Sequence, residues 1–66
     1  MKAYSGKELI RLLEDNDWRV ERIEGSHHIL TRADREETIS VPVHGNHSLK
    51  IGMIRAILRT ARITPP

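Results

Sequence analysis

The chain has 66 residues, 38% of them hydrophobic, with one Trp, one Tyr and no Phe, so we expect one domain over residues 1–66 with a small aliphatic core. The absence of Cys excludes disulfides, thiolate metal sites and cysteine nucleophiles, and the short length excludes a cofactor enzyme with a deep pocket. The net charge of +2 hides a division, because residues 1–37 hold seven basic and nine acidic side chains, whereas residues 38–66 hold four basic and no acidic ones. This division, −2 against +4, suggests an anionic partner, although a solvated basic helix would give the same pattern.

A first helix is predicted after Tyr4. Ser5 is followed three residues later by Glu8, a spacing at which each side chain can bond the free backbone N–H of the other residue. The Asn16-Asp17 pair is expected to end the helix. The apolar stripe that should face the core consists of Leu9, Ile10, Leu12 and Leu13.

Residues 18–31 form short stretches rich in β-branched residues, which predict a hairpin. Its turn centres on Gly25, where a positive φ has no steric cost, so His27 and His28 begin the second strand. A third strand is predicted over residues 38–43, where polar and apolar residues alternate. Pro42 cannot donate a hydrogen bond to a sheet ladder, so this strand should lie at a sheet edge or end near the proline.

Helical periodicity returns over residues 49–63, with an apolar arc of Met53, Ile54, Ile57, Leu58 and Ala61. Arg55, Arg59 and Arg62 have i, i+4, i+7 spacing and are expected to share one stripe of this helix. The predicted order is α-β-β-β-α, an α+β fold in which a three-stranded antiparallel sheet carries two helices on one face. Double-stranded-RNA-binding domains have the same order of elements.

Four histidines lie around two predicted loops: His27, His28, His44 and His47. His44 and His47 have an i, i+3 spacing that a zinc site can use, but no Cys is present and no carboxylate lies beside them, so no metal site is predicted. As polar loop and strand-end residues, the four need no function, and this interpretation suits His27 and His47 better than His28. A third interpretation is acid–base catalysis, because imidazole exchanges protons near neutral pH and RNA carries its own 2′-hydroxyl nucleophile.

Four short motifs occur in order along the chain: Ser-Gly-Lys-Glu-Leu-Ile at residues 5–10, Gly-Ser-x-His at 25–28, Pro-Val-His at 42–44 and Leu-Lys-x-Gly at 49–52. Together they resemble the HicA toxins of bacterial and archaeal toxin–antitoxin systems, and the likeness covers nearly the whole chain. Many members have Pro where this chain has Ile51, a difference that concerns the start of the last helix and not the chemistry.

The resemblance implies an endoribonuclease that cleaves mRNA without a metal or other cofactor and is neutralised by a HicB-like antitoxin. It also implies a fold like that of double-stranded-RNA-binding domains, and it places the essential histidine at His28. The residues themselves agree, because a residue just after a glycine turn is presented at the rim of a sheet with its backbone held. Gly25 is expected to support the turn. Ser26 either orients the imidazole or the phosphate, or is an ordinary turn serine. His44 is a secondary candidate for the general acid.

RNA binding is expected to come from phosphate contacts, because so small a fold lacks a deep pocket for reading bases. The candidate residues are Lys50, Arg55, Arg59 and Arg62, although each alone would more often be a solvated surface charge. Tyr4 and Trp18 are the only aromatic residues, and Trp18 is expected partly in the core, so recognition by base stacking is not predicted.

Two alternatives need no catalysis. The chain could be an RNA-binding module of the double-stranded-RNA-binding type, or a module that docks another protein through its open sheet edge or a helix face.

No apolar run approaches the roughly 20 residues that cross a bilayer, and the N-terminus lacks the apolar stretch of a secretory signal. We therefore expect a cytoplasmic protein that binds no membrane. The resemblance to HicA toxins implies that any DNA binding belongs to the antitoxin, so no direct DNA binding is expected without it.

Overall fold

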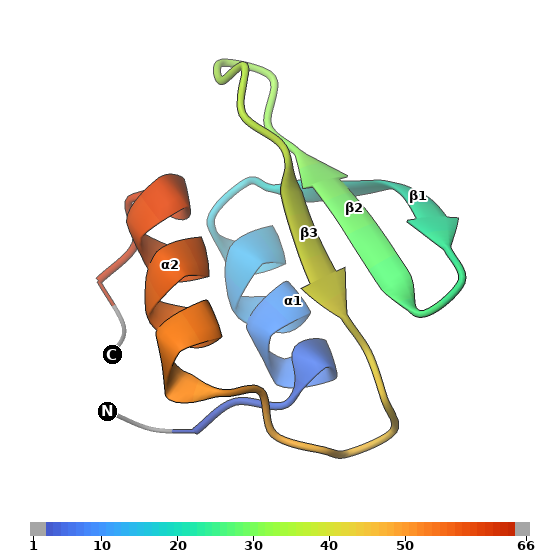
Figure 1. Ribbon diagram of the computed structural model, residues 1–66. Helices are drawn as coiled ribbons and strands as arrows, with labels where there is room; N and C mark the ends of the chain where they lie inside the picture. The colour runs from blue at the N-terminus through green and yellow to red at the C-terminus, as the bar shows by residue number, and fades with distance from the viewer. Residues whose placement is uncertain (1–2, 65–66) are drawn as a thin grey trace.

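The computed structural model describes residues 3–64, which form five elements in the order α1, β1, β2, β3, α2 (Figure 1). Helix α1 (Gly6–Asp15) begins at the predicted capping pair. The Ser5 hydroxyl accepts a hydrogen bond from the Glu8 N–H at 3.2 Å, and the Glu8 carboxylate accepts one from the Ser5 N–H at 2.9 Å. The helix ends at Asn16, whose backbone N–H bonds back to the last turn. The predicted start and end of this helix are both confirmed.

Three antiparallel strands form one sheet in chain order: β1 (Arg19–Glu24), β2 (His27–Thr31) and β3 (Ile39–Pro42). β1 and β2 make the predicted hairpin, and Gly25, with a φ of 60°, is the first residue of its two-residue turn. β3 is an edge strand and ends at Pro42, as the missing proline N–H requires. It is one residue shorter at each end than the alternating pattern predicts.

Strand β1 contains a bulge that the sequence pattern does not indicate. Val20 pairs with Leu30, and Ile23 pairs with His28, so β1 advances three residues while β2 advances two. The extra residue in this stretch is Glu21. The bulge therefore sets which residue of β1 lies opposite His28.

Helix α2 (Ile51–Ala61) is shorter at both ends than the predicted 49–63. Lys50 is its N-cap, and Arg62 is its C-cap with a left-handed backbone, at φ 58° and ψ 44°. The prediction that Arg62 continues the arginine stripe of the helix is therefore wrong, because the chain turns away at that residue. Met53, expected in the core, is 43% exposed.

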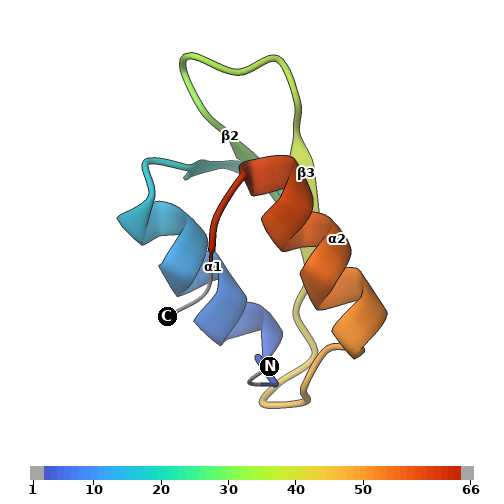
Figure 2. The same ribbon diagram turned by 90° about the vertical axis from the view of Figure 1, so that its left-hand side faces the viewer.

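Both helices cover the same face of the sheet, as Figures 1 and 2 show from two directions. Their apolar sides meet the sheet in one core, where Trp18 is only 1% exposed. The buried cluster consists of Tyr4, Leu9, Ile10, Leu13, Trp18, Leu30, Ile39, Val41, Ile54, Ile57, Leu58 and Ala61. The predicted α+β architecture, with two helices on one face of a three-stranded antiparallel sheet, is confirmed. Within residues 3–64, no helix has the length and apolar character needed to span a membrane.

The segments that lead into the two helices are tied together. Ser5 and Ser48 form an isolated antiparallel bridge, and the Leu49 N–H donates to the Tyr4 carbonyl oxygen at 2.8 Å. As a result, the N-terminal ends of α1 and α2 lie at the same end of the molecule as the β1–β2 turn and the loop after β3 (Figure 1). The loop between β2 and β3 and the C-terminal end of α2 lie at the opposite end.

Candidate active site around His28

His28 is the second residue of the central strand β2, and its imidazole lies on the helix-facing side of the sheet. Its partners across the two ladders are Ile23 on β1 and Val41 on β3. Residues directly opposite one another in antiparallel strands share a face, and Val41 is completely buried in the core. Leu30, two residues further along β2, is buried on the same face. His28 is therefore at the margin of the core, and it is half-buried.

The two ring nitrogens of His28 have different surroundings. Nδ1 is buried and has no hydrogen-bond partner among residues 3–64. Nε2 is not among the buried atoms without a hydrogen-bond partner, and it has no such partner within residues 3–64, so it retains some exposure to solvent. No hydrogen bond from residues 3–64 to Nδ1 orients the ring.

Gly25 and Ser26 lie where the sequence predicts, in the turn just before β2. The Ser26 carbonyl oxygen accepts a hydrogen bond from the Val43 N–H at 2.7 Å, which extends the β2–β3 pairing beyond the end of β3. The turn that precedes His28 is therefore anchored to the neighbouring strand. The Ser26 hydroxyl does not bond to Nδ1 of His28, so the imidazole is not oriented through that contact.

The other three histidines are exposed and lie apart from the core. His27 pairs with Pro42 and lies on the open face of the sheet, opposite to the face of its neighbour His28. His44 and His47 belong to the loop after β3, where the His47 N–H donates to the His44 carbonyl oxygen at 3.1 Å. In the part of the chain that the structure describes, no three His, Cys, Asp or Glu side chains are grouped as a metal site would need.

Two arginines, one on β1 and one in the β2–β3 loop, are paired with nearby acids. Arg22 pairs with Glu21 and Glu24, and Arg35 pairs with Glu37 at 3.1 Å. The hydrogen bond from Arg35 is the main reason that the pKa of Glu37 is lowered to about 2, and the positive charge of Arg62 contributes to the same shift.

The basic residues of α2 have no such partners. Lys50, Arg55 and Arg59 are exposed and make no ion pair with any residue between 3 and 64. Their charges are therefore available to an anion.

The predicted cationic residues are distributed along the length of α2. Lys50 is at the end of the molecule that holds the β1–β2 turn, and Arg55 lies one turn further along the helix. Arg59 is in the last turn, and Arg62 follows it beside the acidic loop. Since an 11-residue helix is about 16 Å long, the structure brings Lys50 towards the His28 end and leaves Arg59 and Arg62 at the other.

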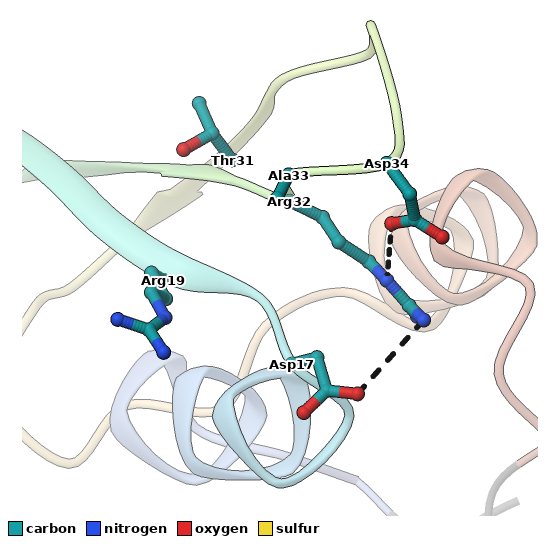
Figure 3. A pocket seen from close by; sticks show the side chains of 6 residues that line it. All are labelled: Asp17, Arg19, Thr31, Arg32, Ala33 and Asp34. Atoms are coloured by element: carbon teal, nitrogen blue, oxygen red, sulfur yellow. Dashed lines mark ion pairs between the residues drawn. The ribbon is translucent and has the colours of Figure 1, made fainter.

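A surface pocket of about 530 Å³, which the sequence does not indicate, lies between the start of β1 and the end of β2 (Figure 3). Arg32 crosses it and pairs with Asp34 at 2.7 Å and with Asp17 at 3.9 Å, while the Arg19 side chain points away from this group. The arginine at the centre of the pocket is thus already paired with acidic side chains. The pocket is also at the end of β2 away from His28, so it is separate from the candidate site.

The sequence was also compared with known proteins. The family model described as the HicA toxin of bacterial toxin–antitoxin systems matches residues 6–63, from the first residue of α1 to just beyond α2. No curated protein sequence matches the chain. The match covers every helix and strand of the fold, including the Gly-Ser-x-His turn and His28. The chain therefore belongs to the HicA toxin family, the toxins of toxin–antitoxin systems.

Proposed function

We propose that this toxin is an endoribonuclease that cleaves mRNA in the cytoplasm without a metal or other cofactor, and that His28 is its catalytic residue. The observation that carries the proposal is the placement of His28. Its backbone is held between two strands, one ring nitrogen is buried, and the other retains some exposure to solvent. A catalytic base needs this combination of fixed position and access.

The reaction that fits a single histidine is attack by the 2′-hydroxyl of RNA on the adjacent phosphorus. His28 Nε2 accepts the 2′-hydroxyl proton as the new P–O bond forms, and the bond to the 5′-oxygen breaks to leave a 2′,3′-cyclic phosphate. The 5′-oxygen takes up a proton, for which His44, in the loop at the same end of the molecule, is the secondary candidate. The substrate supplies the nucleophile, so the protein needs only a base, a proton source and positive charge.

The positive charge comes from side chains that are free to meet phosphate. Lys50 and Arg55 are the nearest of the predicted cationic residues to the His28 end, and the N-terminal ends of both helices point towards that end (Figure 1). Arg59 and Arg62 would contact a longer stretch of RNA. Tyr4 and Trp18 are buried, which leaves no aromatic side chain for base stacking within residues 3–64.

A HicB-like antitoxin would neutralise the toxin by covering His28 or by occupying the cationic face of α2. Acidic side chains on that partner would complement Lys50, Arg55 and Arg59, which have no acids of their own.

The test is cleavage of mRNA by purified protein in EDTA, together with growth after induction. His28→Ala should lower the cleavage rate by at least about 100-fold, because general acid–base catalysis contributes 10²–10⁴. His27→Ala is the matched control, since the neighbouring imidazole lies on the other face of the sheet and should be dispensable. Equal activity of His28→Ala and the wild type would refute the assignment, and activity lost to EDTA would point to a metal.

The unpaired cations of α2 also favour a second candidate, a non-catalytic module that binds structured RNA. This alternative predicts salt-sensitive binding with no cleavage and no toxicity. A protein-docking module would show no RNA affinity at all, and replacing Arg55 and Arg59 would then change nothing in a binding assay.

A further inference from the structure

Gly6, the first residue of α1, makes an unusually close contact with the end of β3. A Cβ atom placed on Gly6 would lie 2.3 Å from the Pro42 carbonyl oxygen and 3.1 Å from both Cα and Cγ2 of Val43. The first distance is too short for any side chain, and the obstacle is backbone. Gly6 does not have a positive φ, so the closeness of the two segments, and not the backbone conformation, requires glycine here.

The segment that Gly6 touches is the one that pairs with the beginning of β2. Pro42 is opposite His27, and the Val43 N–H donates to the Ser26 carbonyl oxygen. Val41, the next residue back along β3, is opposite His28. The first turn of α1 therefore meets β3 at the residue that follows the Val41–His28 pair.

The first turn of α1 is also fixed from its other side. The residue before Gly6, Ser5, forms the bridge to Ser48, and its side chain closes the capping pair with Glu8. The capping pair lies within the turn itself, so the bridge to Ser48 is the contact that opposes a shift of the turn away from β3. A side chain at Gly6 would therefore displace β3 or the first turn of the helix.

The buried Nδ1 of His28 links the contact between Gly6 and the end of β3 to the candidate site. Because that nitrogen has no hydrogen-bond partner among the described residues, the imidazole depends on its packed surroundings for its orientation. We infer that Gly6 is a positioning residue for His28: its missing side chain lets α1 close against Pro42 and Val43, and this closure keeps the imidazole in a productive orientation. The inference rests on the proposed function for its effect on rate, but not for its effect on the ring.

The test compares Gly6→Ala with Gly52→Ala in the full chain. Gly52 is the matched control, because it also lies in the first turn of a helix and no atom lies within 4 Å of a Cβ placed there. Gly6→Ala should lower kcat for RNA cleavage by about 10–100-fold, because a misplacement of about 1 Å can cost that much, with KM changed less than twofold. Gly52→Ala should leave both constants as they are.

The second measurement needs no RNA and records the ring itself. In ¹⁵N spectra of the histidine side chains at one pH, Gly6→Ala should shift the His28 ring signals and leave those of exposed His47 in place. A folded Gly6→Ala variant with a lower melting temperature but unchanged His28 signals and unchanged kcat would overturn the inference, since Gly6 would then be merely structural.

Two further results keep the inference separate from folding and from the proposed function. If Gly6→Ala does not fold, Val43→Ala opens a gap at the same contact without a clash, and it should also shift the His28 ring signals; unshifted signals would overturn the inference. If His28→Ala cleaves RNA as well as the wild type, the proposed function fails, while a shift of the ring signals in Gly6→Ala would still support Gly6 as the residue that positions the ring.

Discussion

The guanidinium group of Arg35 lies over the indole ring of Trp18, with 5.5 Å between Cζ and the ring centroid. The same guanidinium donates from Nη2 to the carbonyl oxygen of Thr60, in the last turn of α2, and pairs with Glu37. One side chain thus joins the loop between β2 and β3, the core tryptophan and the second helix. Among residues 3–64, no other side chain of the β2–β3 loop donates a hydrogen bond to α2.

We expect Arg35→Ala to destabilise the protein more than any replacement of an exposed arginine. The substitution removes a charged hydrogen bond to a helix carbonyl and a cation–aromatic contact at once, whereas exposed ion pairs contribute little. Urea unfolding of Arg35→Ala and of the control Arg22→Ala, whose pairs with Glu21 and Glu24 are on the surface, measures the difference. Equal midpoints in the two variants would contradict this role.

The ion pair between Glu37 and Arg35 should make stability depend on acid. The pKa of Glu37 in the folded protein is lowered from 4.5 to about 2, chiefly by the hydrogen bond from Arg35, so the contribution of this group is present above pH 4.5 and is lost as the pH falls towards 2. Glu37→Gln should therefore cost stability at pH 6 and cost progressively less below pH 4. Urea midpoints across this range, with Glu36→Gln as the control, test the sign. A constant difference between Glu37→Gln and wild type at all pH values would refute it.

The positions of the cations along α2 predict a gradient of RNA affinity. Measured in the inactive His28→Ala background, Lys50→Ala and Arg55→Ala should each reduce the slope of log K against log salt by about 1, the amount for one lost phosphate contact. Arg62→Ala should change it less, because Arg62 lies beside Glu37 at the far end of the helix. Fluorescence anisotropy at several salt concentrations gives these slopes. A larger effect of Arg62→Ala than of Lys50→Ala would place the RNA at the opposite end.

The left-handed conformation of Gly25 gives a prediction for the hairpin. An L-residue at a φ of 60° costs about 1–2 kcal/mol, so Gly25→Ala should lower the free energy of unfolding by about that amount, and Gly25→Asn by less. Nothing lies within 4 Å of a Cβ at Gly25, so the cost is in the backbone and not in packing. Thermal melting of the two variants distinguishes these causes: an equal loss for Ala and Asn would indicate a steric clash.

Local sequence signals predicted the elements well. The Ser5–Glu8 spacing, the glycine of the hairpin turn and Pro42 each act within a few residues, and each lies where it was expected. The same local signals do not predict features that depend on contacts between segments distant in the sequence. The contact of Gly6 with β3 and the bond from Arg35 to α2 are of this second kind.

The candidate site was predictable only in part. Its position after the Gly25 turn follows from the sequence, and the family match includes it. The face on which His28 lies does not follow, because it depends on strand register and on which face of the sheet the helices cover. The helical periodicity of the sequence likewise does not predict that Arg62 has a left-handed backbone. This conformation ends the helix and takes Arg62 out of the arginine stripe.

The adjacent positions of His27 and His28 determine what a one-residue change in the register of β2 would do. His27 and His28 are neighbours on alternating faces, so sliding β2 by one position would present His27 to the helices and turn His28 outward. An imidazole would occupy that face in either alignment. Only the present one, however, keeps Leu30 opposite Ile39 in the core. Leu30 and Ile39, which take no part in the chemistry, therefore decide which of the two histidine side chains lies on the helix-facing side of the sheet.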